Sequence, residues 1–321
     1  MTEVAPRLHH RFAPPAPLPP NPVAMCGWEY WPRLAPSLHV CDRSFMRACR
    51  PLRLTNDQLR QLKSQMLHEG YFHLPPMDWN LPLPEMADVI RRLASFGAPP
   101  VLAFHYDEFW LMYKQLEPLL RTLLGDDPVM LPEFWAWHVD PKHQGAGWAP
   151  HRDRGHTSLL PDGSAKVVTL WLPLTDATPL NGCLYIVPAD RDPTYGTAEE
   201  GWHGFSLADI RALPARSGSI LGWNQAVLHW GSHAADRDTP PRISIACEFQ
   251  RRDVEPYNQH LLDFREPPDM AARQAAIGHQ ILRYQHMDDV GDDWRACAQR
   301  LVAGADPPDP HSTGIARAAT A

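Results

Sequence analysis

The sequence predicts a mainly β core with helical additions, an α+β protein whose strands form an antiparallel sandwich or barrel. Three observations predict it. Apolar residues recur at helical spacing between residues 55 and 124, and short β-branched segments separated by turns follow from about 167 to 249. No helices alternate with these strands as they would in a parallel βαβ arrangement. A last helical stretch, about 268–302, is expected to pack outside the core.

The helical half of the chain has three predicted helices. Thr55 can cap the first and Gln58 can reach back to it, which is a capping box, and Gly70 supplies the stop. The second fits residues 84–96. The third fits about 105–124, where Pro118 should kink or split it because proline removes a helical hydrogen bond.

The strands of the second half are recognised by composition. Residues 167–172 (VVTLWL) are β-branched and apolar. The Asn181-Gly182 pair predicts a hairpin turn, with residues 182–188 as the return strand. Residues 218–222 and 242–249 predict two further strands.

Both ends of the chain differ from the middle. Residues 1–24 are rich in proline and predict an extended arm, and residues 304–321 predict a flexible tail. Between them we expect a single domain over residues 25–303, with a helical scaffold about 55–125, a β core about 130–255 and the helical extension about 268–302. No internal repeat is visible.

Composition excludes several classes of protein. The net charge of −7 argues against a nucleic-acid binder, and no apolar run approaches the roughly 20 residues of a membrane span. No secretory signal precedes the domain, so a cytoplasmic protein is expected. The six cysteines form no CxxC pair, which disfavours a structural zinc site and predicts reduced packing residues.

The candidate metal ligands are His151, Asp153 and His229. Residues two apart in an extended segment point to one face, so His151 and Asp153 can reach the same metal ion. His229 follows a predicted strand and can supply the third ligand. Two histidines and one carboxylate are the facial triad of non-haem Fe(II) oxygenases. The chain has 17 histidines, and alternative ligands or groups around the metal are His138, His143, His156, His203 and His233.

Arg242 lies 13 residues beyond the third candidate ligand, His229. Arg242 opens the last predicted strand and shares a face with Ser244. A buried guanidinium is costly unless a carboxylate meets it, and its fork together with a hydroxyl suits the far carboxylate of 2-oxoglutarate. The alternative is that Arg242 pairs with Glu248 or with an aspartate.

These residues resemble the phytanoyl-CoA dioxygenase (PhyH-like) family of Fe(II)/2-oxoglutarate-dependent oxygenases. The resemblance covers most of residues 55–250, and residues 171–188 (WLPLTDATPLNGCLYIVP) are its most specific part. It implies a double-stranded β-helix, or jelly roll, that belongs to the cupin-like folds. It also implies Fe(II) at His151, Asp153 and His229, and 2-oxoglutarate at Arg242 with Ser244.

The reaction that the resemblance implies is oxidation of a small molecule by dioxygen. 2-Oxoglutarate would give succinate and carbon dioxide while an unactivated C–H bond is hydroxylated; desaturation, epoxidation or cyclisation are alternatives with the same cofactors. Asp153 disfavours halogenation, since halogenases of this type lack the carboxylate. Family members usually continue Gly-Ser-His after Val-Pro, whereas this chain has Ala189-Asp190-Arg191. The resemblance therefore does not predict the identity of the substrate.

Three residues are candidates for contact with the substrate: Trp137, Trp148 and Arg152. Trp137 or Trp148 could form an apolar wall, although packing in the β core is the favoured explanation for these tryptophans. Arg152 and Arg154 flank the ligands and could meet an anionic group or lie at a solvated rim. Two rival functions are a cupin-like hydrolase or isomerase that ignores 2-oxoglutarate, and a catalytically silent binding protein.

Overall fold

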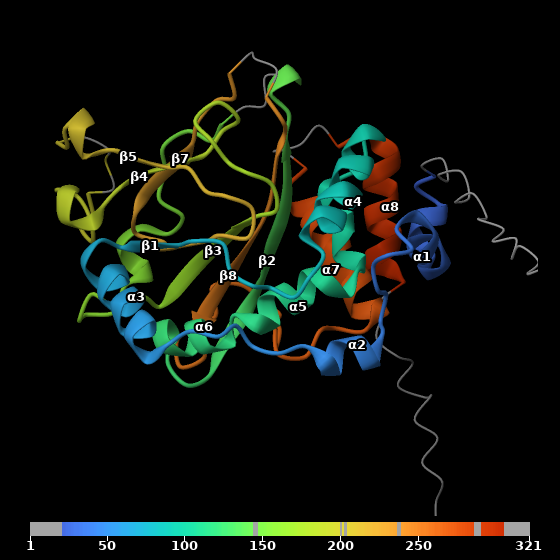
Figure 1. The fold of residues 1–321 in the computed structure, drawn as a ribbon, viewed down its shortest axis with the longest axis horizontal. Coiled ribbons are helices and arrows are strands. Elements are labelled where there is room, and N and C mark those ends of the chain that lie inside the picture. Colours follow the sequence, from blue (N-terminus) through green and yellow to red (C-terminus); the bar gives the residue numbers. More distant parts are fainter. Residues whose placement is uncertain are drawn as a thin grey trace, which may run out of the picture.

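The computed structural model describes residues 21–143, 147–199, 201, 204–235, 239–285 and 290–304. Most of the predicted N-terminal arm and nearly all of the predicted tail lie outside these residues. Two antiparallel sheets form the core, and helices lie mainly to one side of it (Figure 1). Within the described residues, no helix is both long and apolar enough to cross a membrane.

The larger sheet has five strands and the smaller has three. Their orders are β1-β6-β3-β8-β2 and β5-β4-β7, with every pair antiparallel. The strands are β1 (Tyr71–Leu74), β2 (Pro128–Val139), β3 (Val167–Pro173), β4 (Leu184–Val187), β5 (Arg211–Leu213), β6 (Ile220–Asn224), β7 (Leu228–Gly231) and β8 (Arg242–Arg251).

One apolar cluster lies between the two sheets. Trp171 and Leu221 of the larger sheet pack there with Leu184 and Ile186 of the smaller one. This is the inner core of a mainly antiparallel, jelly-roll-like fold with helical additions, as the sequence predicted.

The helices cover the other face of the larger sheet. Side chains such as Ile243 and Ile245, which alternate with the inward-facing positions of β8, pack there in a second and larger cluster. The longer helices are α3 (Asn56–His68), α4 (Leu83–Ser95), α5 (Asp107–Gln115), α6 (Glu117–Leu124), α7 (Met270–Arg283) and α8 (Asp292–Ala303); α1 (Trp31–Leu34) and α2 (Arg43–Ala48) are short.

Local signals placed the first helices correctly. The capping box of α3 is present, with Thr55 accepting from the Gln58 amide and the Gln58 side chain accepting from the Thr55 amide. The third predicted helix is split at Leu116 into α5 and α6, with Pro118 in the first turn of α6, where it needs no hydrogen-bond partner.

The hairpin predicted at Asn181-Gly182 is wrong. The turn exists, and Gly182 has the positive φ of 85° that it requires, but β4 pairs with β5 and β7 rather than with β3. Both edges of β3 are already occupied by β6 and β8. Asn181 therefore directs the chain from one sheet to the other, with its amide nitrogen donating to the carbonyls of Asp176 and Pro240.

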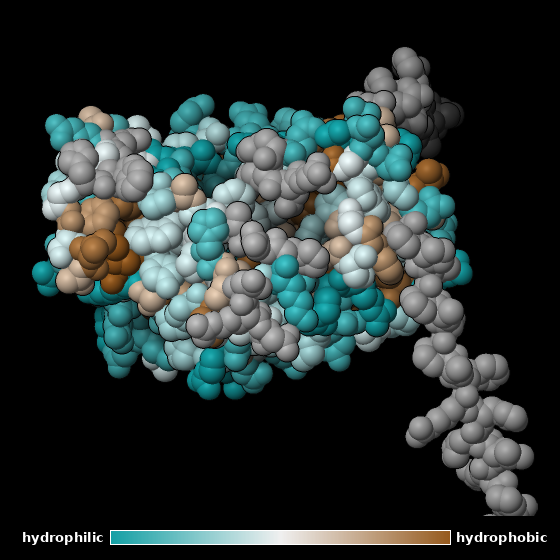
Figure 2. All heavy atoms as spheres, turned by 90° about the horizontal axis from the view of Figure 1, so that it is seen from above, coloured by the Kyte–Doolittle hydropathy of each residue, from teal (hydrophilic) through white to brown (hydrophobic). Residues whose placement is uncertain are grey.

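Two further elements differ from the predictions. Residues 71–74, inside the expected helical scaffold, form the edge strand β1, which pairs with β6. The expected helical stretch of residues 268–302 is two helices, α7 and α8, which pack against each other. The face seen in Figure 2 is mostly hydrophilic, and hydrophobic residues gather in limited patches near its two ends.

Candidate metal centre

The structure brings His151, Asp153 and His229 together. His229 lies on β7, whereas His151 lies in the segment between β2 and β3 and joins β7 by an isolated antiparallel bridge. The two histidines exchange backbone hydrogen bonds, each of 3.0 Å, and their ring centroids are 4.4 Å apart. The third ligand, His229, is therefore 78 residues beyond His151 in the sequence but lies directly beside it in the fold.

Three possible ligand atoms converge. The Asp153 Oδ1 atom lies 3.4 Å from His151 Nε2 and 3.6 Å from His229 Nε2, and the three candidate atoms all lie within 4.8 Å of one another. Among the described residues, this is the one group of three or more histidine, cysteine or carboxylate side chains that could hold a metal ion. Two imidazole nitrogens and one carboxylate oxygen suit Fe(II).

Hydrogen bonds to the other side of each ligand fix its orientation. His151 Nδ1 lies 2.8 Å from the Ala149 carbonyl oxygen, and His229 Nδ1 lies 3.1 Å from that of Val227. A carbonyl can only accept, so each Nδ1 carries the proton and each Nε2 offers a lone pair to a metal. The local backbone thus selects the tautomer that a metal site requires.

The carboxylate is held in the same way. Asp153 Oδ2 accepts from the Thr169 hydroxyl at 3.1 Å and from the Trp223 indole at 3.0 Å. Gln225 in turn donates to Thr169. Because both donors use Oδ2, the Oδ1 atom is left to face the two imidazoles, which favours a monodentate ligand.

Electrostatics favour the protonation state that a metal needs at two of the three groups, Asp153 and His229. Burial opposes the ionisation of Asp153, but the neighbouring imidazoles and the indole of Trp223 hold its pKa well below the usual range. Burial lowers the pKa of His229. At His151 burial acts in the same direction, but the hydrogen bond and charge of Asp153 outweigh it and raise the pKa.

The three ligands line a cavity of about 240 Å³ between the sheets, and Arg242 opens into the same cavity. Arg242 is 4% exposed, and its guanidinium makes no ion pair with a described residue. Burial lowers the pKa of Arg242 to about 10. Glu248, the alternative partner considered from the sequence, binds Arg154 instead. An unpaired guanidinium in this position is suited to an anionic ligand.

Ser244 lies next to Arg242 along the same face of β8. It is fully buried, and its hydroxyl has no hydrogen-bond partner within the described part of the chain. It is not among the residues that line the cavity. Its hydroxyl is nevertheless a second unsatisfied polar group beside the arginine.

The candidate substrate residues fall into two groups. Trp137 and Trp148 line the cavity, with ring centroids 5.1 Å apart in an edge-to-face arrangement. Arg152 does not line it: its guanidinium forms a buried ion pair of 2.7 Å with Asp192 and donates to the Ala226 carbonyl. Arg152 therefore has a structural role, because it connects the ligand segment to Asp192 and to the backbone at Ala226.

Three of the alternative histidines lie elsewhere. His156 and His233 are exposed, and His138 lies on β2 beside a different pocket. His203 and Trp202 fall outside the described residues. Of the other tryptophans near the predicted site, Trp135, Trp171 and Trp223 line the cavity.

Sequence reasoning missed two polar residues of the cavity, Glu133 and Thr169. Thr169 had a usable signal, because it is the polar residue inside an otherwise apolar strand. Glu133 had none, since its strand was not predicted. Their roles depend on which strands pair.

Comparison with known proteins now adds the family. Residues 90–237 match the family model described as phytanoyl-CoA dioxygenase (PhyH), and this stretch contains all three candidate ligands. This region belongs to the phytanoyl-CoA dioxygenase family. The chain is accordingly a 2-oxoglutarate-dependent non-haem iron oxygenase, an oxidoreductase with Fe(II) and 2-oxoglutarate as cofactors.

Solved structures resemble the chain more remotely. The epimerase SnoN, solved with Fe3+, alpha ketoglutarate and nogalamycin RO, is 20% identical, with 61% of this chain and 85% of that chain covered and a TM-score of 0.48. The non-heme monooxygenase ThoJ is 16% identical over 75% and 99% of the two chains, with a TM-score of 0.48.

EctD from S. alaskensis, solved with 2-oxoglutarate and 5-hydroxyectoine, is 17% identical over 69% of this chain and 86% of that chain, with a TM-score of 0.44. No curated protein matches the sequence significantly. At these identities and TM-scores, the solved structures carry no argument about the reaction or the substrate of this oxygenase.

Proposed function

We propose that this oxygenase hydroxylates a small molecule at an unactivated C–H bond, with succinate and carbon dioxide as co-products. The observation that carries the proposal is the shared cavity. Three ligand atoms of the right chemistry converge on it, and a buried, unpaired arginine opens into it beside them. A metal-dependent hydrolase or isomerase would need that arginine only for an anionic substrate, whereas 2-oxoglutarate always brings a carboxylate for it.

The protein's own residues would hold the two cofactors as follows. His151 and His229 would bind Fe(II) through Nε2 and Asp153 through Oδ1, because their other polar atoms are already engaged. The iron and the keto acid supply the oxidising chemistry. Arg242 would bind the far carboxylate of 2-oxoglutarate through its guanidinium fork, with Ser244 as a neighbouring donor.

The walls of the cavity would hold the substrate and exclude water. Trp137 and Trp148 form an apolar surface within the same cavity as the ligands. Replacing either one with alanine should raise the KM for the substrate more than it lowers kcat, because the loss is mainly of binding area. Unchanged KM values in both variants would restrict these tryptophans to packing.

The experiment that tests the cofactor sites is anaerobic addition of Fe(II) and then 2-oxoglutarate to the apoprotein. The wild type should develop the weak visible charge-transfer band of the chelate, and Asp153→Ala and Arg242→Ala should lose or weaken it. A folded, iron-loaded wild type without the band would refute the proposed site and bring forward the cupin-like alternative.

The reaction itself is tested by admitting oxygen and screening candidate small molecules. Succinate should form in proportion to a product that is heavier than its substrate by one oxygen atom. A product lighter by two hydrogens would instead indicate desaturation or cyclisation by the same cofactors.

A further inference from the structure

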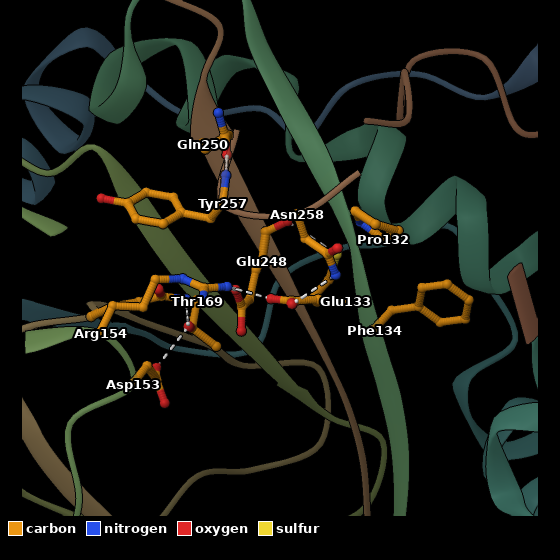
Figure 3. Close-up of polar contacts among 12 residues, drawn as sticks. Pro132, Glu133, Phe134, Asp153, Arg154, Thr169, Glu248, Gln250, Tyr257 and Asn258 are labelled. Carbon is orange, nitrogen blue, oxygen red and sulfur yellow. Dashed lines mark hydrogen bonds and ion pairs between the residues drawn. The ribbon is translucent and has the colours of Figure 1, made fainter. Parts of the chain in front are cut away.

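Arg154 immediately follows the candidate ligand Asp153, yet its guanidinium turns away from the metal centre. Figure 3 shows it reaching across to two carboxylates, Glu133 and Glu248. The Nη2 atom of Arg154 lies 2.6 Å from Glu248 Oε2 and also bonds to Glu133. Glu133 belongs to β2 and Glu248 to β8, two strands that pair with each other. Arg154 therefore ties the ligand segment to the larger sheet.

The three ionisable side chains are largely buried, and burial together with the neighbouring Glu133 raises the pKa of Glu248. The exposed fractions of the side chains are 20% for Arg154, 3% for Glu133 and 18% for Glu248. Buried charges are costly unless each one is paired and hydrogen-bonded. Glu133 meets this condition fully, because it also binds Arg283 and accepts from the Asn258 amide at 3.0 Å. Losing Arg154 would leave Glu248 without a cation.

The backbone beside Asp153 is fixed as well. The amides of Arg154 and Gly155 both donate to the Gln225 carbonyl, at 3.1 and 3.0 Å. The side chain of Gln225 donates to Thr169, which donates to Asp153. The ring of Tyr257 stacks 4.8 Å from the guanidinium carbon. Side chain and backbone thus hold the same short segment from opposite sides.

This segment needs such anchors because it is not a strand. His151 forms one isolated bridge, and Asp153 and Arg154 lie in irregular structure. A ladder of backbone hydrogen bonds is therefore absent where a ligand must be held within a fraction of an ångström. Side-chain anchors have to supply the rigidity.

We propose that Arg154 is a positioning residue for the iron site, with Glu133 and Glu248 as the two carboxylates that clamp it. The clamp sets the direction in which Asp153 presents Oδ1 to the metal. This inference rests on the proposed ligand set. It adds three residues outside the proposed ligand set, two of which, Glu133 and Glu248, also line the cavity.

The test measures metal binding with Co(II), whose visible bands report ligand geometry and need no turnover. Arg154→Ala should weaken Co(II) binding by at least about 10-fold, the effect typical of losing an interaction that orients a ligand, and should alter the visible bands. Arg154→Lys should give an intermediate affinity, since an ammonium cannot match both carboxylates. Arg252→Ala is the control, because Arg252 forms an exposed ion pair with Asp127.

A second variant keeps the test sound if Arg154→Ala fails to fold. Glu133→Gln keeps the shape and an acceptor for Arg154 but removes a carboxylate whose pKa, against the effect of burial, is lowered by its hydrogen bond to Glu248 and by the charge of Arg154, and it should shift the Co(II) bands. Reduced thermal stability with unchanged affinity and spectrum would overturn the proposal and leave a purely structural ion pair. If the wild type binds Co(II) but not 2-oxoglutarate, the proposed function fails while the clamp stands. If it binds no metal, both fail.

A separate observation concerns two cysteines far from the cavity. Cys26 ends a short 3-10 helix, Ala24–Cys26, and Cys297 lies on α8. Their sulfur atoms are 3.1 Å apart although the residues are 271 positions apart in sequence. The hydrogen bond from Cys297, with the nearby Arg300 guanidinium, lowers the pKa of Cys26 to about 6. The sequence had predicted reduced cysteines that serve mostly in packing.

We further propose that Cys26 and Cys297 form a reversible disulfide that joins the two ends of the domain. With a peroxide as oxidant, one Sγ–Sγ bond forms, both thiol protons leave and the peroxide is reduced to two waters. Cys26 would react with the peroxide first because it is partly exposed, whereas Cys297 is fully buried. The Cys297 thiol would then attack the oxidised sulfur of Cys26 and close the disulfide.

The test is non-reducing peptide mapping by mass spectrometry after treatment of the folded protein with hydrogen peroxide. A linked Cys26–Cys297 peptide should form and disappear with dithiothreitol. Cys26→Ser and Cys297→Ser should each abolish it, and the oxidised wild type should melt at a higher temperature than either variant. Oxidation of Cys26 to a sulfenic or sulfinic acid without cross-linking would overturn the proposal.

Discussion

Arg242 offers the sharpest test of how the cavity works, because its replacement should stabilise the empty protein while destroying a binding site. Burial lowers the pKa of Arg242 from its usual 12.5 to about 10. At about 1.4 kcal/mol per pH unit, the charged form costs the folded state about 3 kcal/mol relative to the unfolded chain. The penalty holds at neutral pH and is relieved only as the pH rises above about 10.

Replacing Arg242 with methionine removes this buried charge but keeps most of the side-chain volume. The apoprotein should therefore gain about 1–3 kcal/mol in free energy of unfolding, in line with replacements of buried charges by apolar residues. At roughly 2–4 °C per kcal/mol for large domains, the melting temperature of the apoprotein should rise by several degrees. Arg242→Lys should show no such gain, because the charge stays.

The same substitution should weaken 2-oxoglutarate binding strongly. Losing one partner of a buried, hydrogen-bonded charge pair costs about 2–5 kcal/mol, which is at least about 30-fold in Kd. The assays are thermal denaturation of the metal-free protein and calorimetric titration of the anaerobic Fe(II) protein with 2-oxoglutarate. A clearly lower melting temperature of the apoprotein, or an unchanged Kd, would refute this account of Arg242.

Three further predictions concern the ligands and the scaffold. Thr169→Val removes one hydrogen bond to the ligand carboxylate and should weaken Fe(II) binding by about 10-fold, measured by competition with a chelator. Arg273→Met should lower the free energy of unfolding by about 3–5 kcal/mol in urea denaturation, because Asp107, fully buried 2.6 Å away, loses its cation, and Asp107→Asn should restore part of this loss. In the metal-free protein, acidification should protonate His151 before His229 in NMR titrations, because the pKa of His151 is raised and that of His229 is lowered.

Each of these predictions has an outcome that would contradict it. Equal iron affinity in Thr169→Val would mean that the remaining indole hydrogen bond suffices to orient the carboxylate. A small loss of stability in Arg273→Met would mean that water reaches the buried aspartate. Protonation of His229 first would show that the two imidazoles do not share the carboxylate as the distances indicate.

The sequence by itself determined the features that depend on near neighbours. The spacing of His151 and Asp153 and the shared face of Arg242 and Ser244 follow from the two-residue period of extended backbone. The capping box at Thr55 and the break near Pro118 follow from hydrogen bonds within one turn of helix. The two-residue period identified two of the three residues whose ligand atoms converge, His151 and Asp153, whereas His229 was chosen because it follows a predicted strand.

Only the tertiary structure decided which strands meet. The Asn181-Gly182 turn was real, but a turn does not choose its partners, and β6 and β8 had already occupied both edges of β3. The clamp around Arg154 depends on the pairing of β2 with β8, which sets two carboxylates opposite one guanidinium. Such pairings are fixed by burial between residues 50 or more positions apart, and no local pattern in the sequence encodes them.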